Sequence, residues 1–507
     1  MTPQETRQGT DAPSGCHPDL RSYLEALDSL GDLDRVTREV SADLEAAAQT
    51  RYSVERVLPA PLFENVVGTA PGLRLLGGAA ALSSVPGRPL ARVALTLGLP
   101  PDSGAADIVE HLVRVGELPG TAPEPVGRDE ASCKQNVLLG DDATLDRFPI
   151  PLVHAEDGGR YANTWGVVVA TTPDKRWTNW SITRIMLLDG KRMVGLVMQP
   201  QHLARIWQEW VDIGEPMPYA LVQGGPPTVP YVGGLPIPYE VDESGYAGAL
   251  HGQPIPVARC ETVDLMVPAS AEIVVEGHVS VTRDAVEGPF GEYAGYMPTA
   301  VSAQPVFSVE AITHRDDPIW PLVAEGRPVD ETHTVSAIGH AAAILGAMRR
   351  AALPVATAWM PPRTAAHWLV ITVREDWRDT LPGVDSAGLV HQIGEVLAGT
   401  HSGRLAPEVF VLDDDIDPAD DADLLWAVGT RIHPTERREV WPGPILPLVA
   451  SYTDEERAQG RGPVVVHDGL QPPVGGGRQS QSSFAQAYPP HIRERVLAAY
   501  ERSAPPE

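Results

Sequence analysis

The sequence predicts a protein of mixed α and β structure that is divided into three regions. The chain has 507 residues, more than one hydrophobic core usually organises, so two or three domains are expected. Residues 126–333 read mainly as strands, whereas helical patterns alternate with apolar strands after residue 334. Hydrophobic residues make up 43% of the chain and charged residues 21%, which is usual for a folded globular protein and excludes a chain disordered throughout.

The first region, residues 1–125, opens with a polar segment that is followed by a helix. Apolar side chains recur at helical spacing, and they predict a helix that begins near His17: Leu20, Tyr23, Leu24, Leu27 and Leu30. Gly31 is expected to end this helix. Short apolar stretches mixed with Pro and Gly follow, and the loop-like GELPGTAPEPVGRDE places a domain boundary near residue 125.

The second region, residues 126–333, is predicted to consist mainly of β-strands. TWGVVVATT and MVGLVMQ read as buried strands, while apolar and polar residues alternate over 273–281 and again over 307–311. One helix interrupts these strands, with Pro200 in its first turn. Its apolar stripe consists of Leu203, Ile206, Trp207 and Trp210.

The third region, residues 334–507, is predicted to form a separate α/β domain. The Ala-rich helix VSAIGHAAAILGAMRRAA precedes HWLVITV, LVHQIGEVLAG, EVFVLDDD and DADLLWAV, so helices and apolar strands alternate. QPPVGGGRQSQSS is predicted to be flexible, and HIRERVLAAY to form an amphipathic helix that closes the chain.

Charge and cysteine content limit the partners and the compartment. The chain has 39 Lys and Arg against 67 Asp and Glu, a net charge of −28, so its surface repels nucleic acids and anionic membranes. Cys16, Cys133 and Cys260 form no CxxC pair, which argues against a zinc ribbon or a disulfide framework. The polar N-terminus lacks the apolar stretch of a signal peptide, and no segment is long enough to span a membrane. We therefore expect a cytoplasmic protein. An anionic small substrate is not excluded, because a local arginine or metal can dominate inside a cleft.

Two acids flank a segment that cannot be regular. In Glu287-Gly-Pro-Phe-Gly-Glu292, the proline and the glycines exclude regular helix and central strand, so both carboxylates lie on a tight turn. If the two carboxylates converge, each raises the proton affinity of the other, as in sites that keep an acid protonated near neutral pH. The same pattern is typical of a surface turn with two solvated acids, and the pattern alone favours that interpretation.

Two further clusters contain groups that bind anions or metals. Thr178-Asn-Trp-Ser-Ile-Thr-Arg184 ends in an arginine that could hold a substrate carboxylate through two hydrogen bonds, although such residues more often form surface ion pairs. Gln199-Pro-Gln-His202 lies at a helix start, which attracts phosphate and keeps a histidine neutral and able to bind a metal. From spacing alone, a partly exposed residue of the helix start is the better interpretation of His202.

Other common catalytic motifs are missing. The chain has no GxxxxGK[ST], no GxGxxG after a strand, no HExxH and no GxSxG. Asp413-Asp414-Asp415 could bind a cation, but the acids that follow favour a loop and a helix cap. Asp330-Glu331-Thr332-His333 could bind a metal, but reads equally well as the lead-in to the Ala-rich helix.

Taken together and in this order, the segments resemble the UbiD family, particularly its ferulic acid decarboxylase branch. The resemblance covers nearly the whole chain. It rests on DLRSYLEALDSLGDLDRV, TNWSITRIMLLDGKRMVGLVMQPQH, PIPYEVDESGYAGAL, CETVDLMVPASAEIVVEG, EGPFGEYAGY, DETHT and VLDDDIDP. Agreement over several long, ordered segments is far more specific than any single motif, and it reverses the interpretations that the separate patterns favour.

The resemblance implies an N-terminal α/β domain, a central split β-barrel that binds flavin, and a C-terminal α/β domain used in oligomerisation. It also implies prenylated FMN, supplied by a flavin prenyltransferase and held through its phosphate by Mn2+ with a nearby K+. Residues that match metal ligands are Asn179, His202 and Glu243; residues that match cofactor contacts are these three with Trp180, Ser181, Ile182, Thr183, Arg184 and Gln201. One imidazole with oxygen donors suits a hard divalent ion that contacts phosphate.

The resemblance further implies reversible decarboxylation of an α,β-unsaturated acid, through cycloaddition to the flavin, by a homodimer or larger homo-oligomer. Arg184, Glu287 and Glu292 match the catalytic residues: Arg184 orients the carboxylate, Glu292 donates the proton, and Glu287 holds Arg184. Aromatic, heteroaromatic and polyene acids all remain open as substrates, as does the physiological direction. The alternative is a non-catalytic or redox flavin-binding protein of the same fold.

The chain departs from the ferulic acid branch at two positions. Gly233-Gly234-Leu235-Pro236 replaces a Ser-Ser-Met-Pro stretch, which removes side chains that could contact K+ or cofactor. A lysine near the flavin phosphate is matched only by Arg461. Tyr293 and Ile338 are expected to line the substrate pocket.

Overall fold

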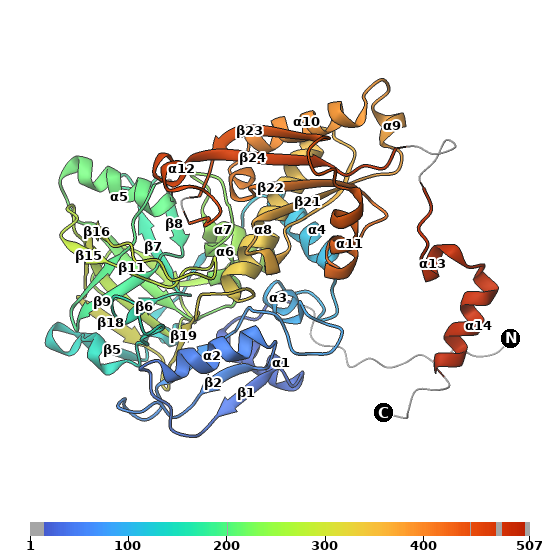
Figure 1. The fold of residues 1–507 in the computed structure, drawn as a ribbon. Helices are drawn as coiled ribbons and strands as arrows, with labels where there is room; N and C mark the ends of the chain where they lie inside the picture. The colour runs from blue at the N-terminus through green and yellow to red at the C-terminus, as the bar shows by residue number, and fades with distance from the viewer. Residues whose placement is uncertain (1–14, 200, 447, 473–478, 502–507) are drawn as a thin grey trace.

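The computed structural model describes residues 15–199, 201–446, 448–472 and 479–501. An N-terminal sheet, a large curled sheet and a C-terminal sheet lie side by side, with helices between them and over their faces (Figure 1). The mixed α and β class and the half-barrel at the centre are therefore as predicted. Within the described residues, no helix is both long and apolar enough to cross a bilayer.

The N-terminal sheet has four strands in the order β1-β2-β3-β19: β1 (Leu33–Val36), β2 (Ala60–Phe63), β3 (Arg74–Gly77) and β19 (Ile319–Leu322). Its helices are α1 (Leu20–Ser29), α2 (Glu45–Glu55) and α3 (Ala91–Thr96), and α4 (Ala105–Gly116) follows. The predicted first helix begins at Leu20 rather than near His17, because the Asp19 side chain caps it by accepting the Ser22 N–H at 2.9 Å. Strand β19 pairs with β3 in parallel across the boundary predicted near residue 125, so distant parts of the chain build this sheet.

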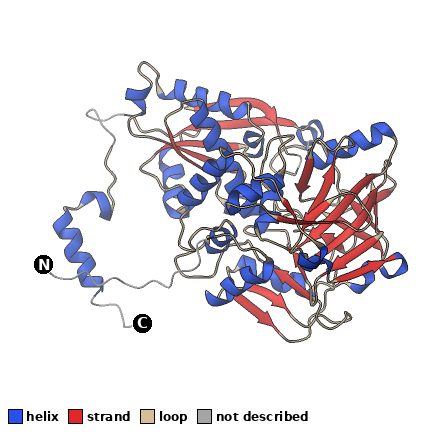
Figure 2. Ribbon diagram, turned by 180° about the vertical axis from the view of Figure 1, so that it is seen from behind, coloured by secondary structure: helices blue, strands red, loops and turns tan. Residues whose placement is uncertain are grey.

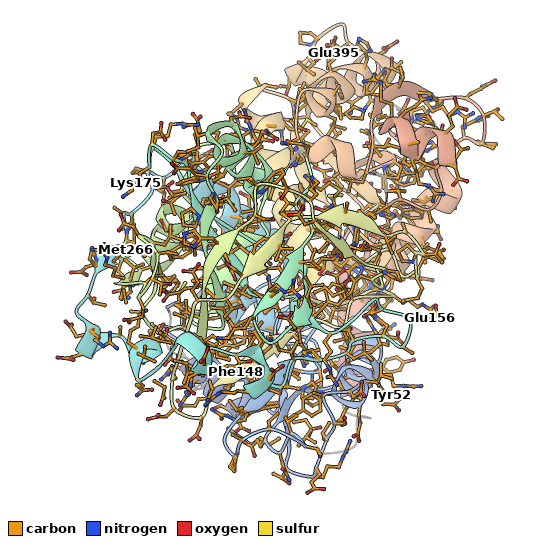
Figure 3. All side chains as sticks on the ribbon, turned by 90° about the vertical axis from the view of Figure 1, so that its left-hand side faces the viewer. Tyr52, Phe148, Glu156, Lys175, Met266 and Glu395 are labelled. Atoms are coloured by element: carbon orange, nitrogen blue, oxygen red, sulfur yellow. The ribbon has the colours of Figure 1, made fainter. Side chains whose placement is uncertain are left out.

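The curled sheet has ten strands. Its main path is β6 (Tyr161–Asn163), β9 (Ile185–Asp189), β10 (Arg192–Gly195), β17 (Val306–Ser308), β14 (Ile273–Val279), β11 (Met217–Gln223), β7 (Val167–Thr171) and β8 (Thr178–Ser181). Strand β18 (Ala311–His314) pairs with β14 and with β5 (Asn136–Leu139). Figure 3 views the molecule from the side of this sheet and labels Phe148, near the N-terminal sheet; the Phe148 ring lies 5.7 Å from that of Trp320 in β19.

Two details of these strands differ from the prediction. Strand β10 ends at Gly195 instead of continuing through Gln199; the Val197 N–H donates to the Gln304 side chain and not to a neighbouring backbone carbonyl. In β14, the Glu276 side chain does not point to solvent, as the alternation predicted, but is fully buried. Its carboxylate accepts hydrogen bonds from Lys134 and from the backbone N–H groups of Glu261 and Thr262.

Shorter elements join the curled sheet to its surroundings. These are β4 (Glu124–Pro125), β12 (Pro256–Arg259) and β13 (Met266–Pro268) in one small sheet, β15 (Ala285–Glu287) with β16 (Ser302–Gln304), and the helices α5 (His202–Ile213), α6 (Thr228–Gly233) and α7 (Glu243–His251). The predicted stripe of α5 is buried at Leu203, Ile206 and Trp207, while Pro200 lies outside the described residues.

The C-terminal sheet has the order β20-β21-β22-β24-β23: β20 (Val355–Trp359), β21 (Trp368–Val373), β22 (Glu408–Asp413), β24 (Arg461–Asp468) and β23 (Arg438–Pro444). Its helices are α8 (Glu331–Arg350), α9 (Trp377–Thr380), α10 (Ser386–Ala398), α11 (Asp421–Arg431) and α12 (Asp454–Gln459). Helix α8, the predicted Ala-rich helix, begins earlier than expected because Asp330 caps it, and it is buried on nearly all sides.

The end of the chain stands apart from the body. Helices α13 (Phe484–Ala487) and α14 (Pro490–Glu501) lie at a distance from the three sheets (Figures 1 and 2), and Leu497 and Tyr500 are exposed. The segment predicted to be flexible falls partly on residues 473–478, outside the described residues. The HIRERVLAAY helix is present as predicted.

The N-terminal region contains a fully buried ion pair whose contribution to stability can be measured. Arg92 of α3 bonds Asp32 through Nε at 2.8 Å and Nη2 at 2.6 Å, and both side chains are inaccessible to solvent. Removing one partner of such a pair leaves an uncompensated charge in the core.

We expect Asp32→Ala to lower the free energy of unfolding by about 3–5 kcal/mol, the cost of an unpaired buried charge. Denaturant titration would measure the change. The matched control is Asp28→Ala, which breaks the exposed pair with Arg35 and should change stability by less than about 1 kcal/mol. Equal stability of the two variants would contradict the prediction.

Candidate active site

An arginine held between two buried acids forms the centre of the site. Arg184 bonds Glu287 in two-pronged fashion, with Nε to Oε1 at 2.8 Å and Nη2 to Oε2 at 3.1 Å. Its Nη1 also donates to Glu292 Oε1. Glu287 is 1% exposed and Glu292 7%, so these carboxylates are not the solvated surface acids that the pattern alone favoured. The structure thus brings the three predicted catalytic residues together.

The shape of the turn explains why both acids reach one arginine. Glu287 ends β15, and Gly288 follows with φ +89°, a backbone conformation that favours glycine. Phe290 is buried, and the Arg184 guanidinium lies over its ring at 5.3 Å. Between its two acids, the turn therefore wraps around the end of the arginine side chain.

The charges of this group favour a proton on Glu292. Burial raises the pKa of Glu292, the Arg184 charge opposes this effect, and Glu287 raises the pKa further; the net shift is upward. With all three groups ionised, one cation faces two anions, so binding one proton neutralises the cluster. Burial lowers the pKa of Arg184, but the neighbouring Glu292 and Glu287 outweigh it and keep the guanidinium charged.

Several contacts around the trio were not anticipated from the sequence. The Tyr161 hydroxyl donates to Glu287 Oε1 at 2.8 Å. Burial, together with the charges of Glu292 and Asp330, raises the pKa of Glu325 to about 8, and Glu325 accepts a bond from Thr332 at 3.1 Å. Neither residue belongs to a pattern that indicates chemistry, since a strand tyrosine and a loop glutamate are common in any fold.

A second cluster consists of the three residues that match metal ligands. Asn179 of β8, His202 at the start of α5 and Glu243 at the start of α7 converge. Asn179 Nδ2 lies 2.7 Å from Glu243 Oε1 and 3.3 Å from His202 Nδ1, and His202 Nδ1 lies 3.2 Å from Glu243 Oε1. Separations of about 3 Å are those of neighbouring ligands around one small divalent ion.

The chemistry of this donor set fits such an ion. It offers a carboxylate, an imidazole nitrogen and an amide, whose oxygen and nitrogen exchange places when the group turns over. Asn179 and Glu243 are buried, and the second Glu243 oxygen is fixed by the Trp180 N–H at 2.9 Å. Gln201 directly precedes His202, and its buried Oε1 atom has no hydrogen-bond partner among the described residues, which leaves it available to a ligand.

The other residues that match cofactor contacts connect the two clusters along one segment. Trp180 and Ser181 end β8, and Ile182 and Thr183 lead directly to Arg184. The Trp180 ring packs in the core, whereas the Ser181 hydroxyl donates to Asn179 Oδ1 at 2.7 Å. The Thr183 hydroxyl donates to the Leu196 carbonyl at 2.6 Å, which orients the chain as it reaches Arg184.

The other residues predicted to contact substrate or cofactor differ in how deeply they are buried. Ile338 is fully buried in α8, and Tyr293 directly follows Glu292. The pKa of Tyr293 is raised by burial and by the charges of Glu292 and Glu325. Arg461 begins β24 and is exposed; no contact described in the structure joins it to the cluster of Asn179, His202 and Glu243.

A cavity of about 630 Å³ lies on the other side of α7, lined by α4, α7, α8 and residues 235–242. Its wall includes Asp242 and Ser244 but not Glu243 between them. Glu243 therefore faces away from this cavity and toward Asn179 and His202.

Comparisons with known proteins place nearly the whole chain in one family. Three domain models of 3-octaprenyl-4-hydroxybenzoate carboxy-lyase match the chain: the N-terminal domain over residues 24–112, the Rift-related UbiD domain over 124–328 and the C-terminal domain over 333–466. The chain is 38% identical to pyrrole-2-carboxylic acid decarboxylase of Pseudomonas aeruginosa, over 94% of this chain and 96% of that protein. It is 35% identical to ferulic acid decarboxylase 1 of Saccharomyces cerevisiae, over 87% and 89% respectively.

A solved structure shows the same fold. An evolved dimeric form of the UbiD-class enzyme HmfF from Pelotomaculum thermopropionicum, in complex with prenylated FMN (prFMN), superposes with a TM-score of 0.76. It is 26% identical, over 92% of this chain and 97% of that one. The chain therefore belongs to the UbiD family of carboxy-lyases.

Proposed function

We propose that this protein is a prenylated-FMN-dependent decarboxylase that converts an α,β-unsaturated acid to the alkene and CO2. The observation that carries the proposal is the buried Arg184–Glu287–Glu292 cluster, in which an anion-binding arginine and an acid of raised pKa lie side by side. Decarboxylation needs both groups, because a carboxylate must be held and a carbon must then be protonated. Hydride transfer by a redox flavoprotein needs no group that holds a carboxylate, which argues against that alternative.

Arg184 orients the substrate carboxylate in this proposal. Its Nε and Nη2 atoms are fixed by Glu287, and its Nη1 atom donates to Glu292. When Glu292 takes up a proton, its attraction for Nη1 weakens, so the arginine can bind a second carboxylate. Glu287 thus acts as the fixed support of Arg184.

Glu292 donates the proton to the carbon that has lost CO2. Its raised pKa keeps it protonated closer to neutral pH than an ordinary glutamate. Glu287 accepts two hydrogen bonds from Arg184 and one from the Tyr161 hydroxyl. The unlike surroundings of the two carboxylates therefore assign them different roles.

Asn179, His202 and Glu243 would hold Mn2+, and through it the phosphate of prenylated FMN. When bound, the prenylated flavin supplies the electron sink that decarboxylation requires. His202 lies at the N-terminal end of α5, where the helix dipole favours an anion. The buried Gln201 Oε1 fits a contact to the cofactor. The side chains of Gly233-Gly234-Leu235-Pro236 carry no polar atoms, so none of them is proposed as a K+ ligand.

The substrate class is that of an aromatic, heteroaromatic or polyene acid. The two curated relatives are named for a pyrrole carboxylic acid and for ferulic acid, both of which carry the carboxyl group on an unsaturated carbon. A flavin prenyltransferase would supply the cofactor, and a homodimer or larger homo-oligomer is the expected assembly, in keeping with the dimeric form of the HmfF neighbour.

Replacing His202 tests the metal and cofactor assignment. We expect His202→Ala, co-expressed with a flavin prenyltransferase, to retain less than about a tenth of the wild-type flavin, since the ion that holds the phosphate loses a ligand. Absorbance and mass spectrometry would measure flavin content, and metal analysis would measure Mn2+. The control His391→Ala removes an exposed histidine of the C-terminal domain and should retain the flavin. Full occupancy in His202→Ala would disprove the assignment.

Replacing Arg184 with lysine tests the orientation of the carboxylate. Lysine keeps the charge but cannot form the two-pronged bond to Glu287 while facing a second carboxylate. We expect Arg184→Lys to bind flavin normally and to lose decarboxylation by about 10²-fold or more. The matched control Arg192→Lys changes an exposed arginine of the neighbouring strand β10 and should keep wild-type turnover. Near-normal turnover of Arg184→Lys would show that the carboxylate is held elsewhere.

Replacing Glu292 with glutamine removes the acid and keeps its shape. We expect Glu292→Gln to fold and to bind prenylated flavin. It should neither release product nor exchange solvent deuterium into the alkene at the carbon that carried the carboxyl group, because both reactions use the same proton transfer. In the wild type, turnover should fall as pH rises through the pKa of Glu292, because the donor must be protonated.

Gas chromatography for the alkene and mass spectrometry for deuterium would measure these outcomes. If Glu292→Gln keeps both activities and Glu287→Gln loses them, the proton comes from Glu287. If the fully loaded wild type exchanges no deuterium into any alkene, the proposed reaction is wrong.

A further inference from the structure

A buried aspartate outside the trio holds the catalytic turn by its backbone. The Asp157 side chain is inaccessible to solvent and accepts the His154 N–H at 2.9 Å and the Gly291 N–H at 3.0 Å. The Gly158 N–H next to it donates to the Pro289 carbonyl at 2.7 Å. Two neighbouring residues of one loop thus fix two backbone groups of the segment that leads from Glu287 to Glu292.

The His154 ring faces an acceptor at each nitrogen. Nδ1 lies 3.1 Å from Asp157 Oδ2, and Nε2 lies 2.8 Å from the backbone carbonyl oxygen of Glu325. A carbonyl only accepts hydrogen bonds, and so does an ionised carboxylate, so both ring nitrogens must carry a proton. The alternative, a protonated Asp157, conflicts with the two backbone N–H groups that point at this carboxylate and favour its ionised form.

The imidazole ring also lies directly against the turn. Its centroid is 5.8 Å from that of Phe290 in an edge-on arrangement. A Cβ atom on Gly291 would lie 2.5 Å from His154 Cε1, so only glycine allows this approach. His154 therefore connects the catalytic turn to the segment that contains Glu325 and precedes α8.

We propose that His154, as an imidazolium paired with Asp157, is a positioning residue for Glu292 that acts through the backbone of Phe290 and Gly291. The ion pair holds the turn in the shape that brings Glu292 to Arg184. The charged group that faces the ring is Asp157, whose charge raises the pKa of Glu292; Glu292 interacts in turn with Arg184, Glu287 and Glu325. The proposal rests on the proposed function only in taking Glu292 as the proton donor.

Hydrogen–deuterium exchange on the full chain without cofactor tests the positioning directly. We expect His154→Gln and Asp157→Asn to speed exchange at least about tenfold in peptides that contain the Gly291 amide, because its acceptor becomes mobile or loses its charge. The control His278→Gln breaks a histidine–glutamate pair between β14 and Glu310, where Nδ1 lies 2.7 Å from Oε1, and should leave these peptides unchanged. Unchanged exchange in both test variants would overturn the proposal. If one variant does not fold, the other decides.

The pH dependence of turnover provides a second readout that a purely structural role would not produce. Asp157→Asn removes a negative charge near Glu292 and should move the alkaline fall in kcat to lower pH. His154→Gln removes a positive charge and should move it to higher pH, each by about 0.5–1 pH unit. Both variants should lose about 10- to 100-fold in kcat with little change in KM. Shifts in the same direction, or none, would overturn the role of the charge.

The two proposals fail in different ways. If wild-type protein loaded with prenylated flavin decarboxylates no acid, the proposed function fails, while the exchange experiment still decides whether His154 and Asp157 hold the turn. If the wild type is active and the turn exchanges at the same rate in every variant, only the positioning role fails.

Discussion

The site depends on one arginine that is buried with two acids. The Arg184 guanidinium lies between Glu287 and Glu292 and compensates the negative charge of one of them. The second negative charge stays in a buried site with little water, where binding a proton is the simplest way to neutralise it. The fold supports this arrangement from several directions. Strand β8 leads into Arg184, β15 delivers Glu287, and the irregular segment after Gly288 returns Glu292 to the same point. A buried group of this kind is costly unless every partner is held in place, which explains the number of bonds around it.

The two clusters share one short segment of chain. Only four residues lie between Asn179 and Arg184, so a ligand bound at the first cluster is fixed in distance from the second. The segment is anchored between them by the Trp180 N–H, which donates to Glu243, and by the Thr183 hydroxyl, which donates to Leu196. Positioning on strands and helix ends gives both clusters a rigid base, as binding and catalysis require.

Much of the fold follows from local patterns, and most of the site does not. The stripe of α5, the buried strand β7 and the cap at Asp330 obey rules of periodicity and hydrogen bonding that act within a few residues. Glu276 breaks the alternation because its partners, Lys134 and the backbone near Glu261, come from other segments. Asn179, His202 and Glu243 are far apart in sequence, so their convergence was predicted only through resemblance to a family. His154 and Asp157 gave no signal, since their role depends on a backbone amide that approaches from residue 291.

The pairing of β19 with β3 has a consequence for how the protein is made. A ribosome releases the chain from its N-terminus, so β3 emerges long before residues 319–322, its neighbours in the sheet. Until then one edge of β3 offers free N–H and C=O groups, with the apolar Leu75 and Leu76 alongside. The nascent N-terminal sheet is therefore an open template during most of translation, and it closes only after the strands of the half-barrel have been synthesised. A fragment cut at residue 125 would keep that edge open permanently and would be prone to aggregate.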